Sequence, residues 1–319
     1  MKSIELNKDI IYDYLNDPHK NLQWGLRFLR IEKLWRIIKK QDLSKVNIAI
    51  IDSGMDLLHE DLCDINIIHA YNFIDDNTNI QDDYGHGTAI TGVIAATANN
   101  NKGIAGIAQN VNIMPLKVID KNGRAEPLNI TRAINWAISH SADIINLSIG
   151  TQSSNDLIEK NSYLINNEEL IVRKLVNKKI TLVSSIGNNK GKSMNFPANL
   201  ENVISVGAYG VKGRPPQIFI SRNNSFSNPT TIFAPGVAIY TSLLNNQYGY
   251  VDGSSAACAF VTGSLGVIRS QFDKNTFYDL LHTNLLKSCD IFEDMGKQNL
   301  ILNVDKLWQI CLEKSININ

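Results

Sequence analysis

The sequence of 319 residues has little cysteine and no long apolar run. Its four cysteines are scattered without C-x-x-C spacing, which argues against a zinc site or a disulfide framework and favours reduced thiols. No stretch of about 18 uncharged apolar residues occurs, so we expect no membrane-spanning segment. Acidic residues near the start stand where a signal peptide would be apolar, and we therefore expect a cytoplasmic protein.

An excess of charge of either sign is also missing. Lys and Arg total 31, as do Asp and Glu, so the formal net charge is zero. Proteins that bind phosphate backbones usually carry a basic excess, and nucleic acid is therefore not expected as the main partner. Hydrophobic residues make up 44% and charged residues 19%, which is typical of a globular chain. No internal repeat or low-complexity linker is found, so we expect one domain.

Apolar, β-branched runs alternate with helical patterns along the chain. We expect buried strands at 46–51, 113–119, 144–148, 180–185 and 203–206. Helical spacing of apolar residues predicts helices at 88–98, 128–141, 156–177 and 256–272, the last of them central and buried. Strands that are apolar on both faces and separated by helices predict an α/β fold with a parallel sheet covered on each side.

Three short motifs carry candidate chemistry. Asp52 ends an expected strand, where it could orient a base, bind a metal or cap a turn. His86 lies between two glycines ahead of an apolar helix, which leaves its imidazole uncrowded, although a lone histidine is more often structural. Ser255 falls in the first turn of a buried helix, where it is either an N-cap or a nucleophile.

Taken together, the three residues favour the catalytic interpretation. A serine hydroxyl is a poor nucleophile until a base takes its proton, and that base needs an orienting carboxylate. The chain order Asp, His, Ser supplies these three roles. The three motifs are Ile50-Ile51-Asp52-Ser53-Gly54, Gly85-His86-Gly87-Thr88 and Gly253-Ser254-Ser255. They resemble the aspartate, histidine and nucleophile motifs of the subtilisin-like serine proteases, the subtilase family.

The resemblance covers roughly residues 16–269 and implies a subtilisin-like three-layer α/β/α fold with a mainly parallel central sheet. It implies a short N-terminal extension at 1–13, without a folding pro-domain, and a peptidase domain at 14–319. His86 would be general base and then acid, Asp52 would orient it, and Ser255 rather than Ser254 would attack. Asn188 stands where the family's asparagine donates to the oxyanion; the alternative is an asparagine in a turn.

The sequence departs from the family pattern around two of the motifs. Ala89 stands where a second histidine is usual, and Ala256 replaces the common methionine. Ala259 and Phe260 replace a usual Pro-His pair in the nucleophile helix. Residues 151–179 are longer than usual and suggest an extra surface helical element. None of these changes removes a catalytic group, and they indicate a divergent, specialised member.

The resemblance also implies a structural Ca²⁺ ion. In calcium-binding relatives two aspartates and an Asn-rich loop share one ion, and hard oxygen ligands suit calcium. The alternative is a solvated Asn-rich turn. The corresponding ligands would be the side chains of Asp17, Asp61 and Asn100 and the carbonyls of Thr97, Lys102 and Ile104.

The substrate implied by the resemblance is an extended peptide that pairs with strands near 121–126 and 147–150. Asn195 at the base of the primary pocket and Asn189 at its rim suggest a polar, uncharged P1 residue, unless both simply bind a loop. Arg124 suggests an acidic residue upstream of the cut. The candidate substrate-binding residues are Arg124, Ser148, Ile149, Gly150, Asn189 and Asn195.

The expected function is therefore that of a serine endopeptidase acting through an acyl-enzyme on a peptide or precursor-peptide substrate. The divergent nucleophile helix and the polar pocket favour a dedicated processing protease that removes a leader peptide, as the cytoplasmic lantibiotic leader peptidases do. A broad intracellular degradative subtilisin is the first alternative. A catalytically silent peptide-binding scaffold is the second, and the intact motifs argue against it.

Overall fold

The computed structural model describes residues 15–38, 45–149, 162–190, 194, 196–225, 228, 230–294 and 296–316. The helices in these ranges are η1 (Lys20–Leu22), α1 (Trp24–Phe28), α2 (Ile31–Ile37), α3 (His86–Ala95), α4 (Pro127–Ser139), α6 (Ser162–Asn177), α7 (Ser254–Arg269), α8 (Lys274–Ser288) and α9 (Val304–Ile316). The strands are β1 (Asn47–Asp52), β2 (Asn66–Ile67), β3 (Tyr71–Asn72), β4 (Asn112–Lys117), β5 (Ile144–Leu147), β6 (Thr181–Ser185), β7 (Val203–Lys212), β8 (Gln217–Ile220), β9 (Ile232–Pro235), β10 (Ile239–Leu243), β11 (Gln247–Val251), β12 (Asp290–Asp294) and β13 (Lys297–Ile301).

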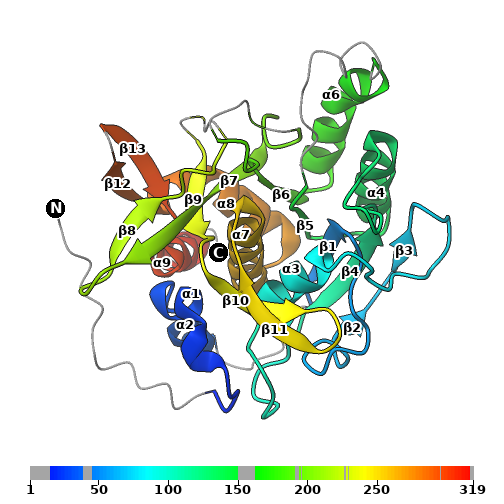
Figure 1. Cartoon of the computed structure of the whole chain (residues 1–319). Coiled ribbons are helices and arrows are strands. Elements are labelled where there is room, and N and C mark those ends of the chain that lie inside the picture. The colour runs from blue at the N-terminus through cyan, green and yellow to red at the C-terminus, as the bar shows by residue number, and fades with distance from the viewer. Residues whose placement is uncertain are drawn as a thin grey trace.

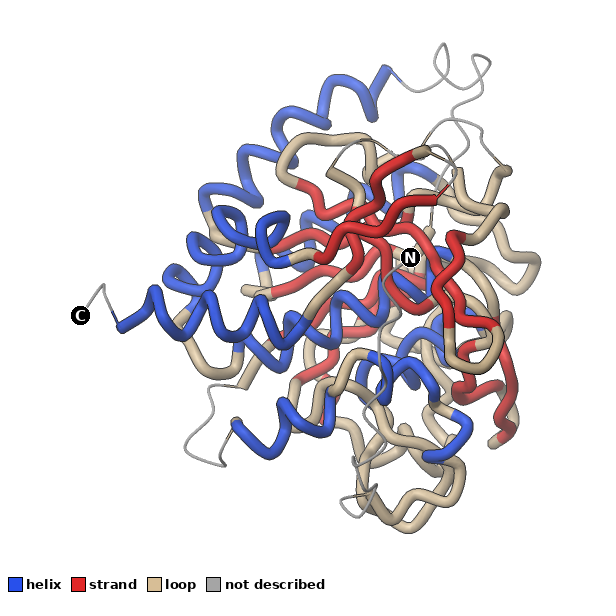
Figure 2. Tube along the Cα trace, turned by 90° about the vertical axis from the view of Figure 1, so that its left-hand side faces the viewer, coloured by secondary structure: helices blue, strands red, loops and turns tan. Residues whose placement is uncertain are grey.

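The central sheet has the strand order β12-β13-β9-β7-β6-β5-β1-β4-β2, with β3 beside β4 and β8 beside β7. The strands from β9 to β2 pair in parallel, whereas β8 and β12 pair antiparallel with their neighbours. Parallel neighbours need crossover connections, and helices provide most of them. In Figure 2 the strands lie in the middle of the molecule with helices around them.

Helices cover both faces of the sheet, as β1 illustrates. Ile48 and Ile50 belong to the hydrophobic cluster that includes α3 and α7, whereas Ala49 and Ile51 belong to the cluster that includes α4 and α6. Successive strand residues point to opposite faces, so β1 has to be apolar along its length. Figure 1 shows α4 and α6 together at one side, away from α3 and α7. The predicted three-layer α/β/α fold is confirmed.

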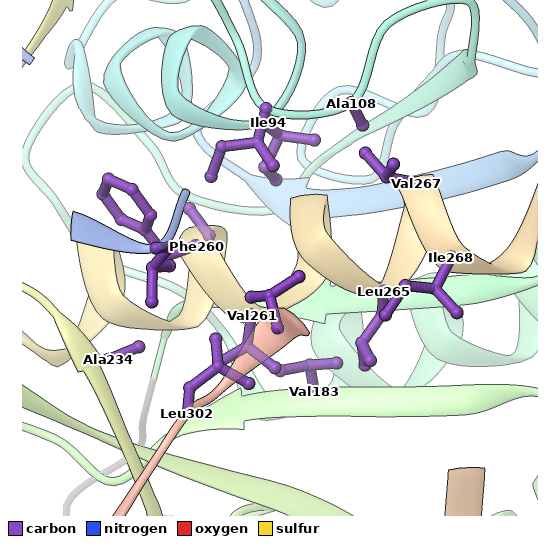
Figure 3. Packing of buried hydrophobic residues seen from close by; sticks show 14 of the residues in the cluster. Ile94, Ala108, Val183, Ala234, Phe260, Val261, Leu265, Val267, Ile268 and Leu302 are labelled. Carbon is purple, nitrogen blue, oxygen red and sulfur yellow. The ribbon is translucent and has the colours of Figure 1, made fainter. Parts of the chain in front are cut away.

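Helix α7 forms the centre of the larger core. All of its residues from Ala256 to Arg269 are buried. Figure 3 shows Val261 on the side of the helix that faces Val183 of β6, and Ile94 of α3 on the opposite side. Phe260 packs against α1, where a Cβ added to Gly25 would lie 2.3 Å from its ring. The phenyl ring at this divergent position is therefore an integral part of the core.

The predicted elements are found with ends displaced by a few residues. β7 is longer than expected because its last part, Tyr209–Lys212, pairs with β8 as well as continuing the sheet. The helix expected at 156–177 is seen as α6 from Ser162, and residues 156–161 lie outside the described residues.

Cys63 is exposed, and the other three cysteines are buried. Within the described ranges, no helix combines the length and apolarity that crossing a bilayer requires.

Candidate active site

Asp52 is the last residue of β1 and is 1% exposed. Its carbonyl accepts hydrogen bonds from the backbone N–H groups of Val118 and Ile119, at 2.8 and 3.2 Å, which tie it to the end of β4. The Ser53 N–H donates to Asp52 Oδ1 at 2.8 Å. The strand end thus fixes both the backbone and the carboxylate of Asp52.

His86 is the first residue of α3 and faces this carboxylate. Its Nδ1 lies 2.8 and 2.9 Å from the two carboxylate oxygens of Asp52. Gly85, with φ of 101°, turns the chain into the helix. The next residue, Gly87, donates its N–H to Ser53 Oγ at 2.8 Å. The contact with Asp52 leaves the other ring nitrogen to face outward, and the side chain is 31% exposed.

Asp82 shapes the turn that precedes His86. Its Oδ1 accepts the N–H groups of Tyr84 and Gly85, and its Oδ2 accepts both the N–H and the hydroxyl of Thr88. Burial by itself would raise the pKa of Asp82, but these hydrogen bonds together lower it. Asp82 therefore stays ionised and closes the first turn of α3 around His86.

The charges around His86 favour its protonated form. Burial by itself would lower the pKa of the imidazole, but the charge and hydrogen bond of Asp52 raise it, and Asp82 adds to this effect. On balance the pKa of His86 lies above its ordinary value. An imidazole in this setting readily accepts a proton, which is what a general base must do.

Ser255 and Asn188 meet through Ser254 at the start of α7. The amide oxygen of Asn188, just beyond β6, accepts the Ser254 N–H at 2.9 Å and the Ser254 hydroxyl at 3.1 Å. Ser254 is fully buried, whereas Ser255 is partly exposed. The Ser255 hydroxyl donates to the carbonyl of Ser148 at 2.9 Å. Of the two serines, only Ser255 is accessible to a substrate.

A buried polar network supports this helix start. Asn146 of β5 donates to Ser148 Oγ at 2.9 Å, and its amide oxygen accepts from the Thr262 hydroxyl at 2.8 Å and the Cys258 thiol at 3.3 Å. Ser148 Oγ in turn contacts the carbonyl of Ser255 at 3.3 Å. The network joins α7 to the end of β5 directly behind Ser255.

Of the candidate substrate-binding residues, Ser148 contacts Ser255, and the other described ones lie on separate loops. Arg124 is exposed on the turn after β4, where its backbone pairs with Asp120. Ser148 is buried and Ile149 is half-buried beyond β5. Asn189 donates its N–H to Ser225 Oγ at 3.3 Å. Gly150 and Asn195 lie outside the described residues.

The predicted calcium ligands include two buried carboxylates, Asp17 and Asp61. The Asn99 N–H donates to both oxygens of Asp17, at 3.0 and 3.1 Å. Burial raises the pKa of Asp17 and the negative charge of Asp61 adds to the rise, against backbone hydrogen bonds from Asn99 and Asn100. In the described part of the chain, neither carboxylate forms an ion pair with Lys or Arg.

The Asn-rich loop closes around Asp61. Asn100 Nδ2 donates to Asp61 Oδ1 at 2.8 Å, and Oδ2 accepts the Ile104 N–H at 2.8 Å and the Tyr248 hydroxyl at 2.7 Å. The Asp61 carbonyl accepts the Thr97 N–H, and the Asn100 amide oxygen accepts the Lys102 N–H. Across the described residues, no three His, Cys, Asp or Glu side chains gather as a metal site. Two uncompensated buried carboxylates among oxygen-rich groups nevertheless fit a hard cation.

Two groups of the site have no role in the sequence-based prediction. Asp82 lies three residues before the histidine motif, and an Asp shortly before a helix is a capping signal that could have found it. Lys117 ends β4 after four apolar residues, yet its side chain is 5% exposed and contacts Ser53 and Asp83. A charged residue closing an apolar run is a weaker signal, since most such lysines reach into water.

Comparisons with known proteins identify the family of the chain. The family model described as the subtilase family, Peptidase_S8, matches residues 44–296. The thermophilic serine proteinase of Bacillus sp. (strain AK1) is 34% identical over 264 residues, 82% of this chain and 61% of that protein. Thermitase of Thermoactinomyces vulgaris is 28% identical over 257 residues, 80% of this chain and 85% of that protein.

A solved structure shares the fold. The crystal structure of the nisin leader peptidase NisP from Lactococcus lactis superposes with a TM-score of 0.74 at 22% identity, covering 92% of this chain and 94% of that one. The chain spans 61% of the thermophilic proteinase and 68% of subtilisin E from Bacillus subtilis (strain 168). With its family model covering most of the sequence, the chain belongs to the subtilase family, whose enzyme class is the subtilisin-like serine endopeptidase.

Proposed function

We propose that this protein is a serine endopeptidase that cleaves peptide bonds through an acyl-enzyme, with Ser255 as nucleophile and His86 as general base. The observation that carries the proposal is the pairing of His86 with the buried Asp52 carboxylate at 2.8 Å. This contact holds the imidazole in the tautomer whose Nε2 accepts a proton. The accessible Ser255 and the amide of Asn188 complete the set of groups that acyl transfer requires.

The proposed reaction proceeds in two halves. The Ser255 hydroxyl turns from the Ser148 carbonyl toward His86, gives its proton to Nε2, and its oxygen forms a bond to the substrate carbonyl carbon. Asn188 Nδ2 donates to the oxyanion that develops, because the amide oxygen is already engaged by Ser254. The C–N bond then breaks as His86 protonates the leaving amine. His86 then takes a proton from water, whose oxygen forms a bond to the ester carbonyl carbon. The bond from this carbon to the Ser255 oxygen breaks as His86 gives the proton to that oxygen.

A fluorophosphonate probe tests the nucleophile, since it labels activated serines. Wild-type protein should be labelled and should cleave peptides. Ser255→Ala should lose both properties while its melting curve stays close to that of the wild type. Ser254→Ala is the matched control: it removes a buried hydroxyl bound to Asn188 and should retain labelling. Labelling that depends on Ser254 and not on Ser255 would contradict the assignment.

We further propose that the substrate is a precursor peptide from which this protease removes a leader. The likeness in fold to a protein titled nisin leader peptidase supports this proposal. We place Arg124, which is exposed on the turn after β4, beside the substrate cleft. A guanidinium there favours an acidic residue upstream of the cut. Asn189, and Asn195 outside the described residues, would favour a polar P1 side chain, because a site built to hydrogen-bond rejects apolar groups.

A peptide-library profile distinguishes leader processing from general degradation. A processing protease should cut after a small set of polar P1 residues and digest casein poorly. Asn195→Ala should broaden P1 preference, and Arg124→Ala should remove any acidic preference. Broad casein digestion with large apolar P1 residues, unchanged in both variants, would favour the degradative alternative.

We also propose that Asp17, Asp61 and Asn100, with the carbonyls of Thr97, Lys102 and Ile104, hold a structural Ca²⁺ ion. Bound calcium would supply the positive charge that the two buried carboxylates lack among the described residues. The Asn100 amide nitrogen faces Asp61 in this structure, so its oxygen must be presented instead when an ion binds.

Thermal unfolding in calcium and in EDTA tests this site. A ligand that binds only the folded state raises Tm, so calcium should raise it and EDTA should lower it. Asp17→Asn should lower Tm in calcium, where it removes a ligand, and raise it in EDTA, where it removes one of two buried like charges. Magnesium at the same concentration is the control for ionic strength. A wild-type Tm that is the same in calcium and EDTA would exclude the site.

A further inference from the structure

The strand register places the side chain of Lys117 on the face of the sheet that carries the Asp52–His86 pair. β1 and β4 lie side by side in Figure 1 and pair in parallel. Their register pairs Asp52 with Lys117. Paired residues of neighbouring strands point to the same face of a sheet. Ile48 and Ile113, which belong to this register, lie in the cluster formed with α3 and α7. Lys117 therefore shares the face on which Asp52 meets His86.

The ammonium group of Lys117 bridges the two segments that carry the pair. Its Nζ donates to the Ser53 carbonyl at 2.6 Å and to Asp83 Oδ1 at 2.7 Å. Ser53 directly follows Asp52 in the chain, and Asp83 lies three residues before His86. The Lys117 side chain is 5% exposed, whereas the Asp83 side chain is 53% exposed. A lysine held in this way is unlike the many surface lysines whose ammonium groups reach into water.

A second link closes the ring of contacts. Ser53 Oγ accepts the N–H of Gly87, the residue after His86, at 2.8 Å. The Ser53 hydroxyl thus contacts the segment after His86. The Ser53 carbonyl contacts Lys117, which also binds Asp83 in the segment before His86. The direct hydrogen bond of Asp52 to His86 lies inside this ring.

We propose that Lys117 is a positioning residue for the proteolytic reaction, which holds the His86 turn against the end of β1 and sets the charge around the Asp52–His86 pair. This inference rests on the proposed function. Lys117 touches neither substrate nor the reacting atoms. Its part is to keep the imidazole within reach of both the carboxylate and the nucleophile, where a displacement of about 1 Å costs on the order of 10²-fold in rate.

The charged groups around the Asp52–His86 pair come from two strands and one loop. Asp52 lies on β1, Lys117 on β4, and Asp82 and Asp83 on the loop before α3. On α7 the charge of Asp52 acts on Cys258, and burial raises the pKa of this residue to about 12, so it is a neutral thiol. Lys117 is therefore a cation on the same face of the sheet as Asp52, and it pairs with Asp83 on the loop before His86.

The test measures the pH dependence of kcat/KM in two variants of opposite charge. Lys117→Met removes a positive charge, which stabilises the imidazolium, so the acidic limb should move to higher pH by about half a unit. Asp83→Asn removes a negative charge, so the limb should move to lower pH by a similar amount. Lys117→Met should also lower kcat/KM about tenfold or more at the pH optimum. Lys287→Met, an exposed lysine on α8, is the control and should change neither quantity.

The double variant Lys117→Met/Asp83→Asn separates charge from position. Its acidic limb should return close to that of the wild type, while kcat/KM should stay low because the bridge is still missing. If Lys117→Met does not fold, Asp83→Asn alone still tests the proposal through its limb. Folded variants with the wild-type limb and kcat/KM within twofold would overturn it. A wild type that neither labels with a fluorophosphonate nor cleaves peptide would instead refute the proposed function.

Discussion

The amide of Asn188 allows its two proposed functions to be separated by substitution. Its oxygen accepts two hydrogen bonds from Ser254, and its nitrogen is the group we assign to the oxyanion. Asn188→Ala removes both. Asn188→Asp keeps an oxygen acceptor for Ser254 and replaces the N–H donor by a carboxylate oxygen. The two variants should therefore differ in stability and agree in lost activity.

The magnitudes follow from these contacts. Ser254 is fully buried, so leaving its N–H and hydroxyl without their acceptor in Asn188→Ala should cost about 1–3 kcal/mol of folding free energy. That corresponds to a fall in Tm of a few degrees for a domain of this size. Loss of one oxyanion donor lowers kcat by about 10²–10³, a range established on a subtilisin. KM should change little, because the donor acts on charge that appears only in the transition state.

The assay combines steady-state kinetics with thermal unfolding on the same preparations. Asn188→Asp should unfold near the wild-type temperature and yet lose at least as much kcat as Asn188→Ala, since it adds a negative charge beside the developing oxyanion. Wild-type kcat in Asn188→Asp would show that another group stabilises the oxyanion. A rise in KM at constant kcat would show that Asn188 binds the ground state instead.

Three further predictions concern the base, the core and the cleft. The neutral imidazole of His86 is the proposed base, and the pKa of His86 is raised above its ordinary value of 6.5. In a pH–rate profile, kcat/KM should therefore increase with pH through a midpoint above 6.5. A midpoint below 6.5 would contradict the charges assigned around His86. Phe260→Ala should lower the free energy of unfolding by about 3–5 kcal/mol in denaturant titrations, since the phenyl ring fills the space against Gly25. A loss below about 1 kcal/mol would mean that neighbouring side chains fill the cavity left by the ring. Arg124→Ala should weaken cleavage of substrates with acidic upstream residues and leave cleavage of neutral substrates unaffected. The measurement is the ratio of kcat/KM for a matched pair of acidic and neutral peptides. An unchanged ratio would show that Arg124 does not contact the substrate.

The sequence predicts the middle of the fold better than its margins. β1, β5 and β6 are buried on both faces, so each appears as an apolar run whatever lies beside it. β12 has the sequence Asp-Ile-Phe-Glu-Asp and is largely exposed, and nothing in its own residues indicates a strand. It forms because β13 joins β9 and offers it a free edge, which is a property of the tertiary structure.

The candidate site shows the same division between local and distant information. Asp52, His86, Ser255 and Asn188 could be predicted because each lies in a short motif at a strand end or helix start, where the chain itself presents the side chain. The direction of the Ser255 hydroxyl toward Ser148 could not, since the two residues are 107 positions apart and meet only through packing of α7 on β5.

The position of Lys117 depends on both its local sequence and the packing of distant strands. Its local sequence, an apolar strand ending in lysine, equally suits a side chain that reaches into solvent. The register of β1 with β4 decides otherwise: a shift by one residue would turn Lys117 to the face of α4 and leave Asp83 without its partner. Once the register is known, the face of the sheet on which Lys117 lies follows from it. A charged residue that ends a strand in register with Asp52 lies on the face that carries His86, and the pH profile of the Lys117→Met variant tests whether its charge acts on that base.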